Sequence, residues 1–222
     1  MGMIVKSDPN GLRRTFDVAA ETYDSARPDY PAELYRDLID LSGVQSDARM
    51  LEIGCGSGKA TRPFAERGFH ITCIELGDRL AEVARRNLSS FPKVEVVTSS
   101  FEDWEGGDLR FDLIYAATSW HWISKAIRYE KAAKLLDPQG HFAFWSATHA
   151  FPSGFDPFFS EIQEVYDAIG ESNEGDWPPQ TPEETPDQTA EIEASGFFEV
   201  MGVRRYVWAN RDIAKCCGSL LH

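Results

Sequence analysis

The sequence has no long hydrophobic run. None of its 222 residues lies in a stretch that approaches the roughly 20 apolar residues a membrane-spanning helix needs. The amino terminus also lacks the apolar core of a secretory signal peptide. Since 42% of the residues are hydrophobic, the chain can still form one domain with a substantial core. We therefore expect a cytoplasmic protein without a membrane partner.

Cysteine and histidine are scarce. Of the four cysteines, Cys55 and Cys73 lie in predicted structural elements and Cys216 is adjacent to Cys217. This arrangement provides neither a disulfide framework nor the spacing of metal ligands. The five histidines form no cluster along the chain. We expect no metal ion in the protein.

Basic residues are missing from one long segment. Residues 135–203 contain fourteen Asp and Glu residues and no Lys or Arg, which accounts for the net charge of −14. Such a segment repels phosphate backbones and so argues against a nucleic-acid substrate. It argues more weakly against a strongly anionic small acceptor. A solvated acidic surface is the simplest explanation of the charge itself.

The sequence does contain a glycine-rich turn. Residues 51–61 read LEIGCGSGKAT, where an apolar run ends in an acidic residue and three glycines at alternate positions. The apolar run predicts the end of a buried strand, and residues 59–67 predict the helix that follows. Glycines in such a turn allow positive φ and let a ligand lie against bare backbone. The candidate positions are Glu52, Gly54, Gly56 and Gly58.

Spacing argues against two other nucleotide-binding motifs. A phosphate-binding P-loop that ends at Gly58 and Lys59 would place Ile53 at its first glycine and Ala60 at its hydroxyl position. A dinucleotide fingerprint would require glycine where Lys59 stands. A tight turn without a ligand remains the alternative.

A second acidic strand end supports a ligand site. The run HITCIEL predicts a strand over residues 70–75 that ends at Glu75, seventeen residues after Gly58. In a βαβ unit this spacing places the carboxylate where it can accept two hydrogen bonds from ribose hydroxyls. We expect Asp78 to cap the next helix, which has Leu80 on its apolar face. A solvated strand terminus is the alternative for Glu75.

These motifs resemble motif I and the following acidic strand end of class I S-adenosylmethionine-dependent methyltransferases. The opening RRTFDVAAETYDSARPDYP is similar to the start of the methyltransferase type 11 group, which includes ubiquinone-pathway enzymes and relatives of trans-aconitate methyltransferase. The resemblance implies an α/β, Rossmann-like, doubly wound and mainly parallel sheet. It also implies S-adenosylmethionine as methyl donor, with S-adenosylhomocysteine as product.

The resemblance also suggests how the other parts of the site are made. In SSFEDW, Ser100 stands where an acid that binds the adenine amine is usual, so either Ser100 or Glu102 would supply that bond. Phe101 would pack on the adenine ring or belong to the core. By position in the family's motifs, the remaining cofactor-binding residues are Tyr23, Arg27, Glu52, Gly54, Gly56, Gly58, Glu75, Leu76 and Ala116.

The fourth predicted strand ends before the sequence SWHWI. Its histidine, His121, is the candidate general base because acceptors meet the cofactor after this strand and imidazole titrates near neutrality. Trp120 and Trp122 would wall the acceptor site, with Tyr30 as a further substrate contact. A packing role of His121 between two core tryptophans is the alternative. No Asn-Pro-Pro-Tyr tetrapeptide, typical of amine-directed enzymes acting on nucleic acid and protein, follows this strand.

The pattern predicts a single domain over residues 1–222. Helices over 11–43 precede a cofactor-binding core over 50–147 with strands at 50–53, 70–75, 94–98, 111–116 and 141–147. An acidic lid or insert is expected over 150–195. Residues 197–208 predict one strand of the hairpin that ends this fold, and a helix begins near 210. The family pattern continues further, so we expect a sheet without its last strand.

These observations favour methyl transfer to a small-molecule acceptor, with a hydroxyl or carboxylate oxygen as the favoured atom. A cofactor-binding protein without catalytic activity is the alternative, because the family's carboxyl-terminal elements are incomplete. A nicotinamide-dependent oxidoreductase is disfavoured by Lys59. The oligomeric state cannot be predicted from the sequence.

Overall fold

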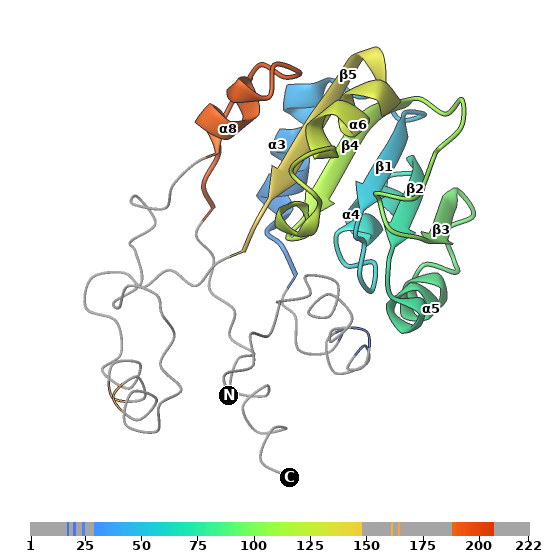
Figure 1. The fold of residues 1–222 in the computed structure, drawn as a ribbon. Coiled ribbons are helices and arrows are strands. Elements are labelled where there is room, and N and C mark those ends of the chain that lie inside the picture. The colour runs from blue at the N-terminus through green and yellow to red at the C-terminus, as the bar shows by residue number, and fades with distance from the viewer. Residues whose placement is uncertain are drawn as a thin grey trace. The chain divides into compact units, whose positions relative to one another are not determined.

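The computed structural model describes residues 17, 20, 24, 29–147, 161, 164 and 188–206. Residue contacts divide the chain into two compact units, one of residues 1–146 with 208–222 and one of residues 147–207. The first unit contains the sheet (Figure 1). The predicted lid lies largely outside the described residues, and the predicted helix near 210 lies entirely outside them. The prediction of a single domain stays a prediction.

A parallel sheet of five strands forms the centre of the first unit. The strands are β1 (Arg49–Ile53), β2 (His70–Glu75), β3 (Val94–Thr98), β4 (Phe111–Ala117) and β5 (Leu136–Trp145). Their order is β3-β2-β1-β4-β5, and every neighbouring pair is parallel. From β1 the chain adds β2 and β3 on one side, and then crosses over to add β4 and β5 on the other side. The boundary between β1 and β4 is therefore the topological switch point of a doubly wound fold. The predicted fold class is confirmed.

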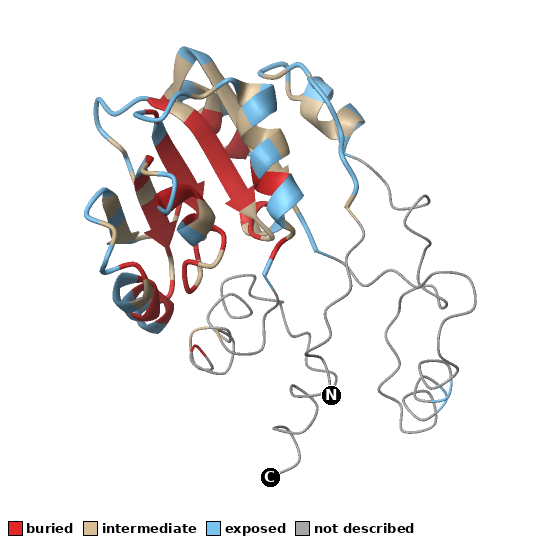
Figure 2. Cartoon of the chain, turned by 180° about the vertical axis from the view of Figure 1, so that it is seen from behind, coloured by how far each residue is buried: buried red, intermediate tan, exposed pale blue. Residues whose placement is uncertain are grey.

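The central strands are buried on both faces, as their almost unbroken apolar sequences predict. In β1 the four residues 50–53 are all buried, and the buried colour of Figure 2 concentrates on the middle of the sheet. At the edge, β5 begins five residues before the predicted start at His141. Its pairing with β4 shifts register between Phe111, which pairs with Leu136, and Leu113, which pairs with His141, so β5 contains extra residues at this point. A Cβ at Gly140 would come within 2.7 Å of the Phe111 carbonyl oxygen.

Helices cover both faces of the sheet. On one face, α3 (Ala32–Ser42) meets α4 (Thr61–Ala65) through Tyr35 and Phe64, whose rings lie 5.1 Å apart. On the other face, Tyr129 of α6 (Arg128–Leu135) packs on Trp120, which in turn contacts Phe142 of β5. Helices therefore pack on both faces of the sheet, as in a doubly wound fold.

Helix α5 (Asp78–Asn87) packs against β2 and β3. Its buried residues are Leu80, Ala81, Val83 and Ala84, which matches the predicted apolar face. The predicted cap was wrong: Gly77 precedes the helix, Asp78 is its first residue, and no local side chain caps it. Instead, Asp17 accepts a hydrogen bond from the Leu80 amide at 2.9 Å. A carboxylate that is distant in sequence therefore caps the helix in place of Asp78.

In the second unit the described residues form α8 (Thr189–Ala194) and the segment that follows it. The strand predicted over residues 197–208 is wrong for residues 197–206, which have no strand conformation, and residues 207 and 208 lie outside the described set. Phe197 and Met201 are exposed, at 49% and 73% of their surface. A strand depends on pairing with a neighbouring strand, and none of the five strands of the described sheet pairs with residues 197–206. No helix in the described part of the chain is long and apolar enough to cross a membrane.

Candidate functional site

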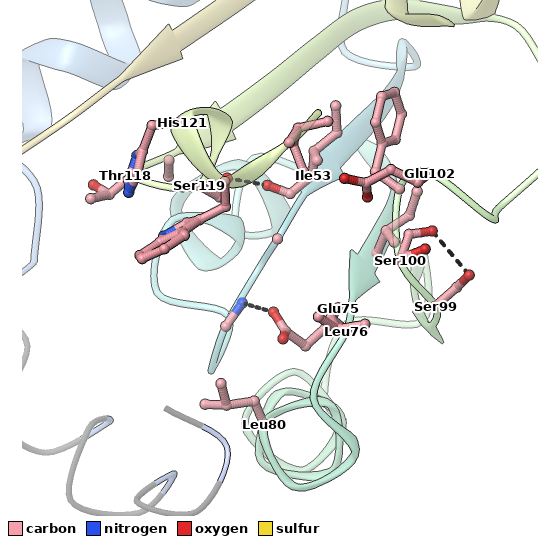
Figure 3. Close-up of a pocket in the computed structure, with 17 residues that line it drawn as sticks. Ile53, Glu75, Leu76, Leu80, Ser99, Ser100, Glu102, Thr118, Ser119 and His121 are labelled. Atoms are coloured by element: carbon pink, nitrogen blue, oxygen red, sulfur yellow. Dashed lines mark hydrogen bonds between the residues drawn. The ribbon is translucent and has the colours of Figure 1, made fainter. Parts of the chain in front are cut away.

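An open pocket of about 200 Å³ lies at the carboxyl ends of β1, β2 and β4. This is the switch point of the sheet, where open α/β folds bind their ligands. Figure 3 shows Thr118 and His121 on one side of the pocket and Ser100 and Glu102 on the other. Glu75 and Leu76 lie between these two groups. The pocket therefore has two ends with an acidic strand terminus in the middle.

Glu75 fastens the glycine turn to the end of β2. Its Oε2 accepts a hydrogen bond from the Gly56 amide at 2.8 Å, and its Oε1 accepts one from the Gly77 amide at 2.9 Å. Burial raises the pKa of Glu75, and these two backbone bonds oppose that shift. The backbone of Leu76 also bonds to this carboxylate, and since a carboxylate has about four acceptor sites, at least one is left for a further donor. The carboxylate is thus held in place and can still accept a hydrogen bond from a ligand.

Two of the three glycines are required for reasons the structure makes explicit. Gly54 has a φ of 70°, and a Cβ there would come within 2.6 Å of the Ser119 Cβ. Ser119 is fixed in turn by a short hydrogen bond that its hydroxyl donates to the Ile53 carbonyl. Gly58 has a φ of 89°, but its missing Cβ makes room for Leu88, the residue after α5, rather than for a ligand. Gly54 and Gly56 line the pocket, and Gly58 does not.

Glu52 lies beneath the pocket rather than in its wall. Its side chain is fully buried, and its Oε2 accepts hydrogen bonds from Thr61 at 2.6 Å and Tyr115 at 2.9 Å. Its Oε1 has no hydrogen-bond partner among the described residues. Burial raises the pKa of Glu52 to about 7, helped by the charge of Glu75 and opposed by the two hydroxyl donors. Glu52 therefore has no direct access to a ligand in the pocket.

The segment after β3 forms the other end of the pocket. Ser100 donates a hydrogen bond to Asp103 at 2.6 Å and accepts one from the Asp103 amide at 3.0 Å, which closes a tight turn. Phe101 is 2% exposed and contacts Trp120, but it also lines the pocket. Glu102 lines the pocket and accepts a hydrogen bond from the Ser124 amide. Both interpretations of Phe101, core residue and ligand contact, are thus compatible with its position.

The sequence Trp120–Trp122 forms the 3-10 helix η1, and its three side chains have different environments. Trp120 is buried in an aromatic cluster with Phe142 and Tyr129, away from the pocket lining. His121 is exposed and lines the pocket, and Trp122 lines it beside His121, with their rings 4.8 Å apart. A histidine packed between two core tryptophans is therefore not what the structure shows.

The pocket brings together most of the residues predicted from the sequence. These are Gly54, Gly56, Glu75, Leu76, Ser100, Phe101, Glu102, His121 and Trp122. Its lining does not include Glu52, Gly58, Ala116, Tyr30 and Trp120. Tyr23 and Arg27 lie outside the described residues. The roles of all these residues in binding stay predictions.

Several residues that line the pocket were not predicted from the sequence. They are Ile53, Ile74, Leu80, Ser99, Ala117, Thr118, Ser119 and Ile123. Ala117, and not the predicted Ala116, faces the pocket. The one available signal for Thr118 and Ser119 is their position directly after a buried strand, where this fold places its ligand sites. No group of three or more His, Cys, Asp or Glu side chains in the described part of the chain could hold a metal ion.

Comparison with known proteins finds a family model that matches the central part of the chain. Residues 50–140 match a family model described as a methyltransferase domain. An uncharacterized methyltransferase of Mycobacterium tuberculosis is 29% identical over 126 residues, which cover 57% of this chain and 49% of that protein. A malonyl-[acyl-carrier protein] O-methyltransferase of Geobacter sulfurreducens is 30% identical over 142 residues, covering 62% of this chain and 53% of that protein. The chain spans about half the length of these curated relatives.

A solved structure agrees with the fold. The structure of the [4+2]-cyclase SpnF superposes with a TM-score of 0.54 at 16% identity, covering 70% of this chain and 67% of that one. At this identity the likeness concerns the fold and not the reaction.

Proposed function

We propose that this protein is a class I S-adenosylmethionine-dependent methyltransferase that transfers a methyl group to a small-molecule acceptor, because residues 50–140 match a methyltransferase-domain family model. The pocket at the ends of β1, β2 and β4 would hold both the cofactor and the acceptor. Oxygen is the favoured acceptor atom. The specific subgroup within the family stays a prediction.

One observation carries the proposal: a buried carboxylate is bonded to the glycine turn at the switch point of the sheet. Glu75 accepts a hydrogen bond from the Gly56 amide at 2.8 Å and keeps acceptor capacity for a ribose hydroxyl. Gly56 lines the pocket with a φ of 57°, so bare backbone is available there for the methionine part of the cofactor. These residues fit the cofactor that the family uses.

The two ends of the pocket suit different parts of the ligand. Leu76 and Phe101 offer apolar surface to the adenine ring, and Ser100 and Glu102 offer oxygen acceptors to its amine. We assign the opposite end, with His121 and Trp122, to the acceptor. Bound S-adenosylmethionine supplies a methyl group already activated by its positively charged sulfur. The chain then has to align the acceptor with that group and exclude water.

His121 is our candidate for the general base. Its side chain is exposed at the pocket, where an acceptor hydroxyl can reach it and lose a proton to it. Trp122 beside it provides a flat apolar wall that would orient the acceptor. An ionised carboxylate would need no base, and the relative from Geobacter is named as an O-methyltransferase. We therefore keep hydroxyl and carboxylate acceptors together.

Calorimetric titration with S-adenosylhomocysteine tests the binding half of the proposal. We expect binding by the wild-type chain and a loss of about ten-fold to over a hundred-fold in Glu75→Ala, because hydrogen bonds to a charged group contribute about 1.5–3 kcal/mol. Glu95→Ala is the matched control, since Glu95 is an exposed glutamate on β3. Equal affinity in Glu75→Ala and Glu95→Ala would contradict the ribose assignment.

A metabolite panel tests the catalytic half. Wild-type protein with S-adenosylmethionine is incubated with hydroxy compounds, carboxylic acids and amines, and S-adenosylhomocysteine release is followed by mass spectrometry. We expect release above the background hydrolysis with an oxygen acceptor. Cofactor binding without release for any acceptor would favour the alternative of a binding protein without catalytic activity.

A further inference from the structure

Thr118 has an unusual backbone conformation at the wall of the pocket. With a φ of 56°, it is the one residue other than glycine with positive φ in the described part of the chain. A β-branched side chain is rarely found in this region, because its Cβ crowds the backbone. Such strain persists where neighbouring contacts enforce it, and it concentrates at functional sites.

Two hydrogen bonds hold Thr118 in this conformation. Its hydroxyl is 2.8 Å from the hydroxyl of Tyr30, and its amide donates to the Trp145 carbonyl at 2.7 Å. Tyr30 is 8% exposed, and its ring packs edge-on against Trp145 with the centroids 5.7 Å apart. The phenol therefore approaches Thr118 from a fixed position. Glycine would adopt this conformation without strain, but it has no hydroxyl. Threonine supplies a hydroxyl that can form a hydrogen bond with Tyr30.

The conformation of Thr118 sets the direction of the chain that follows it. The chain leaves β4 at Ala117, turns at Thr118 and enters η1 within two residues. Beyond the turn, Arg128 is 2% exposed and donates to the Trp120 carbonyl at 3.0 Å, which fixes the first residue of η1. His121 and Trp122 follow directly, and Figure 3 shows His121 on the same side of the pocket as Thr118.

We propose that Thr118 is a positioning residue for the acceptor end of the pocket. Its bond with Tyr30 holds the left-handed backbone and thereby fixes where η1 presents His121 and Trp122. The assignment of that end to the acceptor rests on the proposed function, but the positioning itself is a property of the chain. Thr118 acts through the turn, and we give it no chemical step.

Fluorine NMR of protein labelled with 5-fluorotryptophan tests the positioning without any acceptor. The variant Trp122→Phe identifies the Trp122 resonance among the six tryptophans of the chain. Thr118→Val keeps the branched shape and removes the hydroxyl, and Tyr30→Phe keeps the ring and removes the other hydroxyl. Both should shift or broaden the Trp122 resonance in the same way. Thr118→Ser, which keeps the hydroxyl, should restore the wild-type signal.

Thr72→Val is the matched control, because Thr72 lies in β2 outside the pocket lining. We expect it to leave the Trp122 resonance unchanged. The proposal is overturned if Thr118→Val and Tyr30→Phe lower the melting temperature but leave that resonance in place, since Thr118 would then be merely structural. It is also overturned if Thr118→Ser behaves like Thr118→Val.

The failure of this inference is distinguishable from failure of the proposed function. A wild-type chain that does not bind S-adenosylhomocysteine in calorimetry would refute cofactor binding, while the fluorine spectra would still decide the role of Thr118. Normal binding together with an unmoved Trp122 resonance would refute the inference alone.

Discussion

Replacing Glu52 by glutamine should change how the stability of the protein depends on pH. The Glu52 carboxyl is fully buried, and its burial raises its pKa from 4.5 to about 7. Glutamine keeps one oxygen that can accept the hydroxyls of Thr61 and Tyr115, and it removes the titrating proton. The comparison therefore isolates the cost of ionising this one buried carboxyl.

The sign follows from the two pKa values. Below pH 4.5 the carboxyl is protonated in both folded and unfolded chains and costs nothing. Between pH 4.5 and 7 the unfolded chain ionises first, so the wild-type protein loses stability as pH rises. Above pH 7 the loss is complete and amounts to about 3 kcal/mol, since each unit of pKa difference corresponds to about 1.4 kcal/mol.

Urea unfolding of wild type and Glu52→Gln at pH 5, 6, 7 and 8 measures this dependence. We expect the free energy of unfolding of the variant, relative to wild type, to rise by roughly 2–3 kcal/mol from pH 5 to pH 8, because part of the wild-type loss has already occurred at pH 5. A constant offset from the buried amide does not affect this slope. Glu95→Gln, an exposed carboxylate on β3, should show no such trend. Parallel curves for wild type and Glu52→Gln would refute the reasoning.

Three further substitutions test other parts of the structure. Gly54→Ala should lower the melting temperature and weaken S-adenosylhomocysteine binding in calorimetry, because its Cβ would meet Ser119 at 2.6 Å and its φ is 70°; an unchanged melting temperature would contradict the close contact. Asp17→Ala should reduce the free energy of unfolding by about 0.5–2 kcal/mol, as for a lost helix cap, since Asp17 accepts the Leu80 amide. Urea unfolding decides this, and a change within error would show that water replaces the carboxylate. His121→Gln should lower turnover of a hydroxyl acceptor by about 10²- to 10⁴-fold and leave the melting temperature unchanged, because His121 is exposed. Normal turnover in this variant would exclude it as the base.

The two acidic strand ends, Glu52 and Glu75, show how much of the site could be predicted from the sequence. Both Glu52 and Glu75 end an apolar run, and both were predicted to bind cofactor. The register pairs Glu52 with Cys73, so Glu75 lies two residues further along its strand than the position beside Glu52. That is about 6.6 Å at 3.3 Å per residue, enough to separate a pocket wall from the core. Register between strands depends on pairing and could not be read from either motif.

Small offsets explain the other differences at the site. Side chains alternate along a strand, so moving from Ala116 to Ala117 changes the face of the sheet and hence access to the pocket. In η1 three residues make a full turn, so Trp120 and Trp122, which are two positions apart, point in different directions. Both segments were identified correctly from the sequence. The direction in which each side chain points, however, changes if an element boundary is wrong by a single residue.

Contacts between distant residues were beyond the sequence. A helix cap was expected from Asp78 because capping residues are usually local, yet the acceptor is Asp17, 63 residues away along the chain. In contrast, the strands at 70–75 and 94–98 match the structure at both ends. Long periodic apolar runs decide the strands, whereas individual polar contacts depend on which segments the fold brings together.

Under the proposed function, the close approach of Gly54 and Ser119 limits how the choice of acceptor can evolve. A side chain larger than serine at position 119 would push against the glycine turn, so a mutation selected for a new acceptor there would also disturb cofactor binding. Trp122 contributes to the same pocket and is only partly buried. Adaptive change and library design should therefore concentrate on positions 121 and 122, while position 119 stays under constraint whatever the acceptor.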